Sequence, residues 1–499
     1  MSQLSDYTEI LSGATIIGDA DGVEPTSLAM DTRRVEPGSL FFCVPGASSD
    51  GHDFAAEAVA AGAVALVVDR ELEGITVPQL VVRQVRGAMG PIADTFFGEP
   101  SKRIDVFGVT GTNGKTTTTF LLRAMLEAAG RTSGMIGTTG VVVGGEELET
   151  SFTTPESLDL HRLLRAMSDA GDDSAAVEVS SHALDQHRVK NLRYAAVGFT
   201  NLTRDHLDYH KSFEAYYQAK RLLFTESGPE GQFFPAAINC DDEWGSRLFD
   251  ELVHAEREDV PVWGWTLREM PRASVSASYA LLPDGASIKV ESPVGDFALK
   301  SKLRGRFNVE NVLTAATMAL LAGLTPEQVQ AGLDLVPGVR GRFEPVEAGQ
   351  AFTVLVDYAH TPDSLEQVLS SARAICDREL IVVFGCGGDR DRSKRPLMGR
   401  AASLGADLAI VTSDNPRSED PVAIIAEIKR GMRGGAEVVE EIDRRTAIQR
   451  AVRDARAGDV IVIAGKGHEQ GQTFKDETVP FDDVSVVREA LESDAVGVG

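Results

Sequence analysis

The residues best suited to chemistry lie in "GVTGTNGKTTTT", residues 108–119. A glycine loop between a strand and a helix points backbone N–H groups at phosphates, and the start of the helix faces the same anion. Lys115 adds a positive charge there, and the Thr116 hydroxyl can bind Mg²⁺. The spacing departs from G-x-x-x-x-G-K-[ST], because Val109 stands where the first glycine would be. The segment still predicts a site for nucleotide phosphates.

A carboxylate follows one of the apolar runs. Glu178 comes at the end of "AAVEV", residues 175–179, which is typical of a buried strand. Residues at the carboxyl ends of parallel strands meet at one edge of the sheet, so Glu178 can join Thr116 on one Mg²⁺. The alternative is an exposed carboxylate at the end of a strand.

A second polar segment, "VTSDNPRSEDP" at residues 411–421, follows the apolar run "DLAIV". It holds Arg417 behind a proline, among Asp414, Glu419 and Asp420, at the edge where open α/β sheets bind ligands. One interpretation is a solvated turn whose charges balance. The other is a cation kept for an anionic ligand.

The elements that must position these residues alternate between strand and helix patterns. Residues 104–110 predict a strand, and residues 116–130 predict a helix with one apolar face: Leu121, Leu122, Met125, Leu126 and Ala129. Further buried-strand runs at 175–180 and 195–202 indicate a parallel sheet with its site at the strand ends. Residues 278–292 instead predict a hairpin with a Pro-Asp-Gly turn.

The chain has 499 residues, which suggests about three domains. We expect a small α/β domain over residues 1–100, with strands within 39–46, 63–69 and 79–85 and a helix within 53–63. A central domain over 101–337 holds the glycine loop, and "LVPGVRGRFEPV" marks a joint. A third domain over 338–499 repeats the strand and helix alternation. The predicted fold class is therefore α/β.

Composition excludes several classes of protein. The chain is 43% hydrophobic and 25% charged, and no apolar run is long enough for a membrane span. Its start lacks the basic and then apolar segments of a signal peptide, so we expect a cytoplasmic protein. We also expect a monomer. The four cysteines form no C-x-x-C pair, which predicts reduced thiols. The net charge of -26 makes nucleic acid an unlikely partner and requires local cations around any anionic substrate.

Ten segments in order resemble the Mur ligase family, the amide-forming enzymes of bacterial cell-wall precursor synthesis. They are "TGTNGKT", "EVSSHALDQHR", "NLTRDHLDYH", "AYYQAKRLLF", "GRFNVEN", "GVRGRFE", "VDYAHTPDSLE", "CGGDRDRSKRP", "DNPR" and "GKGHE". The resemblance implies an N-terminal domain for the UDP end, a central P-loop-type ATPase with a parallel sheet, and a C-terminal Rossmann-like domain for the incoming amino acid.

The resemblance also implies a reaction and its substrates. Joining a carboxylate to an amine in water needs activation, which ATP supplies by forming an acyl phosphate that the amine attacks. The segments are most similar to the member that adds meso-diaminopimelate to UDP-N-acetylmuramoyl-L-alanyl-D-glutamate. The alternatives are a lysine-adding ligase of the same fold and, more distantly, a folylpolyglutamate synthetase. A simple P-loop ATPase or switch protein would explain the glycine loop but leaves "GKGHE", "DHLD" and the third domain without a role.

The family's functional positions map onto matching residues of this chain. The ATP positions are Gly111, Thr112, Asn113, Gly114, Lys115, Thr116, Thr117, Asn311 and Arg342, with Asp357 and His360 nearby. His206 is implied as a ligand of a second Mg²⁺, and Lys220 as a lysine carbamylated by CO₂ that becomes a metal ligand. From residue type alone, Lys220 is a helix-surface lysine and Asn311 could be a helix cap.

The implied substrate positions fall in three groups. The uridine group is Thr32 and Ser48, although both lie in segments that could be plain surface loops. The dipeptide group is Thr153, Thr154, Ser180, Gln186 and Arg188. The amino-acid group is Arg390, Asp414, Asn415, Pro416, Arg417, Gly465 and Glu469. Meso-diaminopimelate is lysine with a further carboxylate, so we expect Arg417 to select it, unless a protein carboxylate such as Glu419 pairs with Arg417.

Overall fold

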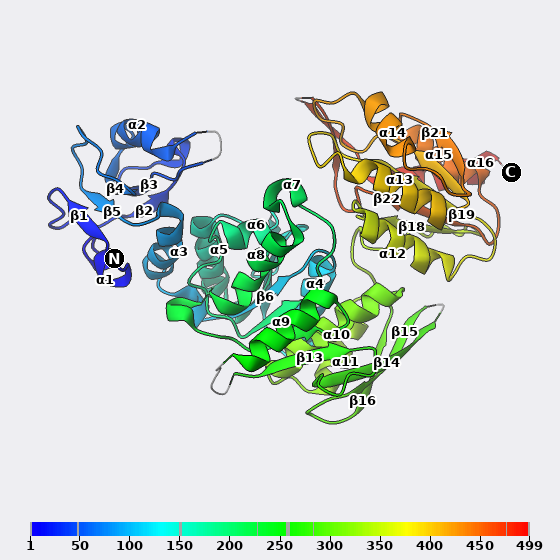
Figure 1. The fold of residues 1–499 in the computed structure, drawn as a ribbon, viewed down its shortest axis with the longest axis horizontal. Helices are drawn as coiled ribbons and strands as arrows, with labels where there is room; N and C mark the ends of the chain where they lie inside the picture. Colours follow the sequence, from blue (N-terminus) through cyan, green and yellow to red (C-terminus); the bar gives the residue numbers. More distant parts are fainter. Residues whose placement is uncertain are drawn as a thin grey trace.

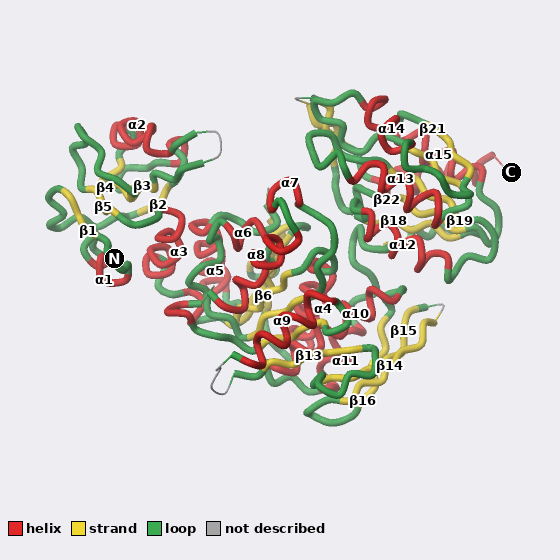
Figure 2. The backbone as a smooth tube through the Cα atoms, viewed as in Figure 1, coloured by secondary structure: helices red, strands yellow, loops and turns green. Residues whose placement is uncertain are grey.

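The protein is described here from a computed structural model, which covers residues 2–46, 49–148, 152–226, 228–255, 260–282, 284–475 and 477–497. Figure 1 shows three bodies in chain order, the first in blue, the central one in cyan to green and the last in yellow to red. Each body is built on its own sheet with helices packed beside it (Figure 2). This arrangement agrees with the predicted α/β class, while the boundaries near residues 100 and 337 stay a prediction.

The N-terminal body has a five-stranded sheet in the order β1-β5-β4-β3-β2, parallel except for β1. Its strands are β1 (Thr15–Ile17), β2 (Ser27–Ala29), β3 (Ser39–Phe42), β4 (Ala63–Val68) and β5 (Gln79–Val81). Its helices are α1 (Asp6–Ile10), η1 (Thr32–Arg34), η2 (Gly51–Phe54), α2 (Ala55–Ala60) and α3 (Val85–Phe96), followed by η3 (Pro100–Lys102). The predicted strands and helix of this region are confirmed, each shorter than its apolar run.

The central body has an eleven-stranded sheet in the order β16-β15-β14-β13-β12-β11-β6-β10-β7-β8-β9. Its strands are β6 (Asp105–Thr110), β7 (Ser133–Gly137), β8 (Gly140–Val143), β9 (Glu146–Leu148), β10 (Ser174–Glu178), β11 (Ala196–Phe199), β12 (Ala236–Asn239), β13 (Val262–Thr266), β14 (Val275–Leu282), β15 (Gly285–Glu291) and β16 (Phe297–Ser301). Its helices are α4 (Lys115–Ala128), α5 (Ser157–Ala170), α6 (Ser181–Asp185), α7 (Leu207–His210), α8 (Phe213–Thr225), η4 (Pro229–Gly231), α9 (Glu243–His254), α10 (Arg306–Leu321) and α11 (Pro326–Asp334).

The middle of this sheet is parallel, as predicted, over the neighbouring strands β7, β10, β6, β11, β12 and β13, and helices pack on both of its faces. Side chains of β6 alternate between the two faces: Phe107 and Val109 pack into one core, and Val106 packs into the other. The predicted apolar face of α4 lies in the first of these cores. The hairpin of β14 and β15 is also confirmed, with Leu282 opposite Gly285, while Pro283 of the predicted turn lies outside the described residues.

The C-terminal body has a six-stranded sheet in the order β17-β18-β22-β19-β20-β21, in which only β17 is antiparallel. Its strands are β17 (Glu344–Pro345), β18 (Thr353–Asp357), β19 (Leu380–Phe384), β20 (Leu408–Val411), β21 (Glu437–Glu440) and β22 (Val460–Ala464), with a separate hairpin of β23 (Gly471–Phe474) and β24 (Glu477–Pro480). Its helices are α12 (Pro362–Arg373), α13 (Lys394–Gly405), α14 (Pro421–Lys429), α15 (Arg444–Asp454) and α16 (Asp483–Gly497). Within the part of the chain that the structure describes, no helix has the length and apolar character to cross a bilayer.

Candidate active site

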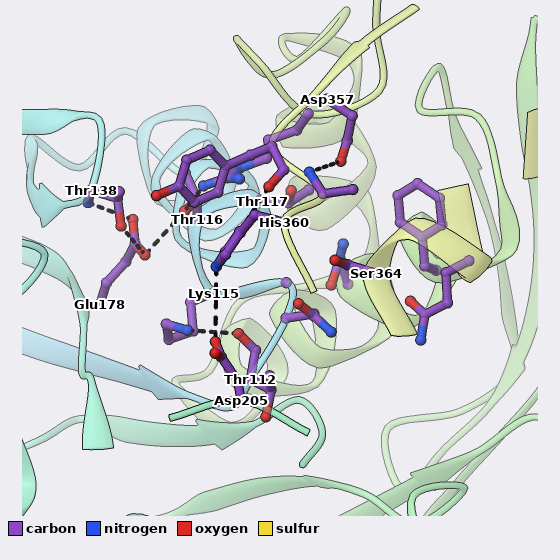
Figure 3. A pocket seen from close by; sticks show the side chains of 18 of the residues that line it. Thr112, Lys115, Thr116, Thr117, Thr138, Glu178, Asp205, Asp357, His360 and Ser364 are labelled. Atoms are coloured by element: carbon purple, nitrogen blue, oxygen red, sulfur yellow. Dashed lines mark hydrogen bonds and ion pairs between the residues drawn. The ribbon is translucent and has the colours of Figure 1, made fainter. Parts of the chain in front are cut away.

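A cavity of about 230 Å³ lies between the glycine loop and the C-terminal body (Figure 3). Most of the predicted ATP and metal positions line it, together with two of the dipeptide group: Thr112, Asn113, Gly114, Lys115, Thr116, Thr117, Thr153, Glu178, Ser180, His206, Asn311, Arg342, Asp357 and His360. Eight more lining residues were not predicted, among them Thr138, Asp205 and Tyr358. The cavity therefore brings residues of the central and C-terminal bodies to one place.

The glycine loop joins the end of β6 to the start of α4, as predicted. Gly114 caps α4 in the left-handed region (φ +87°), and a Cβ there would lie 2.1 Å from Oδ1 of Asn311. A Cβ on Gly111 would lie 1.8 Å from Oγ1 of Thr200, so neither position tolerates a side chain. Nζ of Lys115 donates to the carbonyls of Gly111 and Thr112, both at 2.9 Å. The loop is thus closed around its own lysine.

Asn311 lies inside α10 and is buried against this loop. Its Nδ2 donates to Oδ1 of Asn308 at 3.1 Å. The helix-cap alternative is wrong, because α10 begins at Arg306 and Asn311 is in its second turn. Asn311 instead presents its amide to the turn that is expected to hold phosphates.

Glu178 is 1% exposed at the end of β10, so the alternative of an exposed strand-end carboxylate is wrong. Its Oε2 accepts from Oγ1 of Thr116 at 3.0 Å, and its Oε1 accepts from the backbone N–H of Thr138 at 2.9 Å (Figure 3). Oγ1 of Thr138 lies 3.1 Å from Oε2 as well. Thr138 fixes the Glu178 carboxylate beside the Thr116 hydroxyl. Thr138 was not predicted, because it lies 40 residues from Glu178 and the sequence alone does not link the two residues.

The oxygens of Thr116 and Glu178 fit a Mg²⁺ site. Among the described residues, no three His, Cys, Asp or Glu side chains gather closely enough to hold a metal alone. Mg²⁺ in phosphoryl-transfer enzymes, however, commonly takes only one or two protein oxygens and completes its shell with phosphate oxygens and water. A hydroxyl and a carboxylate in direct contact at the edge of a phosphate loop meet that need.

Asp205 lies between two histidines from different bodies. Its Oδ2 is 3.3 Å from Nε2 of His206. The same oxygen is 3.9 Å from Nε2 of His360 (Figure 3). Nδ1 of His360 is 2.9 Å from the carbonyl oxygen of Tyr358 and donates to it. Desolvation lowers the pKa of His206 and of His360, so both rings are neutral near pH 7 and each offers a nitrogen lone pair. Asp205 was not predicted, although it immediately precedes the predicted His206 in the sequence.

Lys220 is 1% exposed on α8, so the alternative of a helix-surface lysine is wrong. Its Nζ donates to the carbonyl of Gly111 at 2.7 Å and lies 4.6 Å from the ring centre of Tyr216. It therefore sits behind the glycine loop and does not line the cavity. Burial, and then the charge of Lys115, lower the pKa of Lys220 well below its usual value.

Arg342 reaches from the C-terminal body to the glycine loop. Its Nη2 donates to Oγ1 of Thr116 at 2.9 Å, and its guanidinium lies 4.5 Å from the ring centre of Tyr358. Asp357 accepts from the backbone N–H groups of Phe343 (2.6 Å) and Ala359 (2.7 Å), and burial raises its pKa to about 6. Asp357 thus orders the chain on both sides of Arg342 and His360.

The dipeptide group is brought together at the edge of the cavity. Oγ1 of Thr154 donates to the carbonyl of Glu178 at 2.7 Å and accepts from the N–H of Ser180 at 3.0 Å. Arg188 donates to the carbonyl of Thr154 (3.0 Å) and to Oε1 of Gln186 (2.8 Å). Arg188 also pairs with Glu156 at 3.0 Å, a carboxylate that was not predicted. Thr153 lies 3.1 Å from Oγ1 of Thr138, which joins this group to the carboxylate site.

The amino-acid group gathers in the C-terminal body, outside the lining of the cavity. Nδ2 of Asn415 donates to Oε2 of Glu469 at 2.9 Å, and a Cβ on Gly465 would lie 2.5 Å from Oδ2 of Asp414. Buried Lys466, which was not predicted, donates to Asn415 (2.9 Å) and Glu469 (3.1 Å). The same loop carries Pro416 and Arg417, and a backbone bond from Gly388 to Asn415 (2.9 Å) brings in the loop that carries Arg390. Arg390 itself is exposed.

The uridine group is placed in part. Thr32 begins η1 and is half-buried, and this turn is capped by Asp31, which accepts from the N–H of Arg33. Ser48 lies outside the described residues. Thr32 does not line the cavity between the glycine loop and the C-terminal body.

Known families and proteins match nearly the whole chain. Family models match residues 24–97 ("Mur ligase family, catalytic domain"), 109–319 ("Mur ligase middle domain") and 341–467 ("Mur ligase, glutamate ligase domain"). A "UDP-N-acetylmuramoyl-L-alanyl-D-glutamate--2,6-diaminopimelate ligase" of Geobacillus thermodenitrificans is 46% identical over 470 residues, which cover 93% of this chain and 94% of that protein. The chain belongs to the Mur ligase family.

Solved structures extend the comparison. A solved structure of a UDP-N-acetylmuramoyl-L-alanyl-D-glutamate--2,6-diaminopimelate ligase superposes on this Mur ligase with a TM-score of 0.70 and 34% identity, over 99% of both chains. A Mycobacterium tuberculosis folylpolyglutamate synthase complexed with ADP and AMPPCP has a TM-score of 0.62 at 19% identity, over 81% of this chain and 94% of that one, which shows a shared fold alone. The three-domain fold is thus confirmed, and the alternative of a simple P-loop ATPase or switch protein is wrong.

Proposed function

We propose that this Mur ligase joins meso-diaminopimelate to the D-glutamate of UDP-N-acetylmuramoyl-L-alanyl-D-glutamate, with ATP, in peptidoglycan precursor synthesis. Near-full-length similarity to ligases of that name supports the reaction. The choice of amino acid rests on one observation about Arg417. Its guanidinium donates to the carbonyl of Gly388 (2.8 Å) but makes no ion pair within the described part of the chain. The cytoplasmic location and the monomeric state stay predictions.

The side chains that line the cavity have clear tasks in this reaction. The substrate carboxylate attacks the γ-phosphorus of ATP, ADP leaves, and the amine then displaces phosphate from the acyl phosphate. Lys115 and Arg342 stabilise the negative charge that develops on the phosphoryl group during its transfer, where electrostatic catalysis is strongest. Thr116 and Glu178 would hold one Mg²⁺, and His206 together with carbamylated Lys220, which lies behind the glycine loop, would hold a second. Bound Mg²⁺ would lower the repulsion between the phosphate oxygens and the attacking carboxylate.

The position of Arg342 also supports a step in which the central and C-terminal domains close on each other. It lies just after the joint at residues 337–341, and its contact with Thr116 bridges two bodies of the protein. A side chain on a joint can report whether the nucleotide and the amino-acid domain are both in place. This gives Arg342 its proposed role as the sensor of the γ-phosphate.

The function is tested by measuring phosphate release with ATP and UDP-N-acetylmuramoyl-Ala-Glu, with meso-diaminopimelate and L-lysine compared as amine substrates. Removing one partner of a buried Arg-carboxylate pair costs about 2 to 5 kcal/mol, or roughly one and a half to four powers of ten in selectivity. We expect diaminopimelate to be preferred by a margin of that size. Equal use of lysine would contradict the proposal and favour a lysine-adding ligase.

Arg417→Ala should raise the KM for diaminopimelate sharply and narrow its lead over lysine. The reason is that alanine leaves the far carboxylate of diaminopimelate without its cation, whereas lysine has no carboxylate at that end of the molecule. The KM for ATP should stay unchanged, because the loop of residues 414–417 lies outside the lining of the cavity. Steady-state kinetics with both amino acids checks this, and a proportional loss for both would argue against Arg417 as the selector.

A further inference from the structure

The backbone of Arg417 is held in an unusual conformation. Its φ of +51° lies in the left-handed region, which residues with a Cβ adopt only when their surroundings impose it. Its N–H donates to the carbonyl of Thr473 at 3.0 Å, and its carbonyl accepts from the N–H of Lys475 at 2.6 Å. The hairpin that begins with β23 therefore fixes the main chain at Arg417 from one side.

Three carboxylates around Arg417 bind other groups. Asp420 caps α14 by accepting from the N–H of Val422 at 3.0 Å. Asp389, from the neighbouring loop, accepts from Oγ of Ser418 (2.7 Å) and from its N–H (3.1 Å). Glu419, which could have neutralised Arg417, binds two other arginines instead.

Glu419 makes four close hydrogen bonds. Its two oxygens accept from Nη2 and Nη1 of Arg395 at 2.8 and 3.0 Å, a bidentate pair. They also accept from Nη2 of Arg392 and from the N–H of Asp389, both at 2.7 Å. Hydrogen bonds from Arg395 hold the pKa of Glu419 near 2, so the carboxylate stays charged. Arg395 is fully buried at the start of α13, which makes it a rigid anchor.

We propose that Glu419 is a specificity-determining positioning residue, which ties the loop of residues 414–420 to Arg395 and thereby leaves Arg417 as the unpaired cation for the far carboxylate of the incoming amino acid. The inference rests on the proposed function, since it requires that Arg417 recognises that carboxylate. The hydrogen bonds between Glu419 and Arg395 have two effects: they position the loop, and they prevent Glu419 from neutralising Arg417. Glu419 itself does not touch the substrate.

The chain supplies a matched control in Glu427. Oε2 of Glu427 accepts from Nη1 of the same Arg395 at 2.8 Å, but Glu427 lies on α14, beyond the loop. Glu419→Gln and Glu427→Gln each remove one carboxylate charge from Arg395. Only the first removes a bond that holds the loop of Arg417.

The test measures KM and kcat for diaminopimelate and L-lysine in the parent enzyme, Glu419→Gln, Glu427→Gln, Arg417→Ala and the double variant Glu419→Gln/Arg417→Ala. We expect Glu419→Gln to raise the KM for diaminopimelate about tenfold through misplacement of the guanidinium, with the KM values for lysine and ATP unchanged. Glu427→Gln should stay within about twofold of the parent, and in the Arg417→Ala background Glu419→Gln should add less than about twofold. If Glu419→Gln does not fold, Arg392→Gln replaces it, because Arg392 is 65% exposed and bonds to the same carboxylate.

Three results would overturn the inference: equal effects of Glu419→Gln and Glu427→Gln, an additive effect on the Arg417→Ala background, or a parent-like KM in folded Glu419→Gln. A parent enzyme that uses lysine as well as diaminopimelate is a different failure, because it removes the proposed function first. If the parent is selective and Arg417→Ala lowers that selectivity while Glu419→Gln does not, only the role of Glu419 is lost.

Discussion

Lys115→Ala should lose amide formation by a factor on the order of a hundred or more while the protein stays folded. In the structure, Nζ of Lys115 donates to two carbonyls of the glycine loop, so the ammonium is already held where phosphates are expected. Lys115 is partly buried, and desolvation lowers its pKa. A cation in such a site acts strongly on charge that develops during phosphoryl transfer, because its field is weakly screened.

The measurement is phosphate release, with circular dichroism and thermal unfolding to check the fold. Lys102→Ala is a suitable control, since Lys102 is a half-exposed lysine in η3 that pairs with Glu99. It should leave turnover near that of the parent. Near-normal turnover of a folded Lys115→Ala protein would contradict the assignment of the ATP site.

Lys220→Ala should be nearly inactive, and short carboxylic acids should restore part of the activity. Lys220 is buried and Lys115 is partly buried around the same loop, where two ammonium groups repel each other, and burial with that repulsion lowers the pKa of Lys220. A neutral amine is the form that adds CO₂, and loss of the proton from nitrogen leaves a carbamate anion. Carbamylation would therefore replace a repulsive pair by an attractive one and supply an anionic ligand for a metal.

The experiment compares kcat of Lys220→Ala with and without acetate or formate, and mass spectrometry of the parent enzyme under CO₂ looks for the added carboxyl group. The control is Lys115→Ala under the same acids, because a carboxylate cannot take the place of a cation. Activity of Lys220→Ala within a few-fold of the parent would show that the lysine has only a packing role. Equal recovery of both variants would show that the acids act nonspecifically.

The local features of the site could be predicted because neighbouring residues determine them. The change from strand to helix through Gly111 and Gly114, the apolar face of α4 and the hairpin of β14 and β15 each depend on short stretches of chain. Glu178 was found in the same way, since parallel strands bring their carboxyl ends to one edge. The resemblance to a family added the residues whose types alone say little, above all Lys220.

Only the tertiary structure decided the contacts between segments that are distant in the sequence. Whether Lys220 is exposed or buried depends on how its helix packs against a loop whose carbonyl lies 109 residues away, and the carboxylate of Glu178 is oriented by Thr138 in the turn after β7. The sequence placed Arg417 among three carboxylates and left open whether one of them pairs with it. The structure answers this question, because Arg395 and Arg392 bind Glu419 while Asp420 caps a helix. Backbone conformation follows from local sterics along the chain, whereas the choice of ion-pair partners depends on which side chains the packed domains bring within reach.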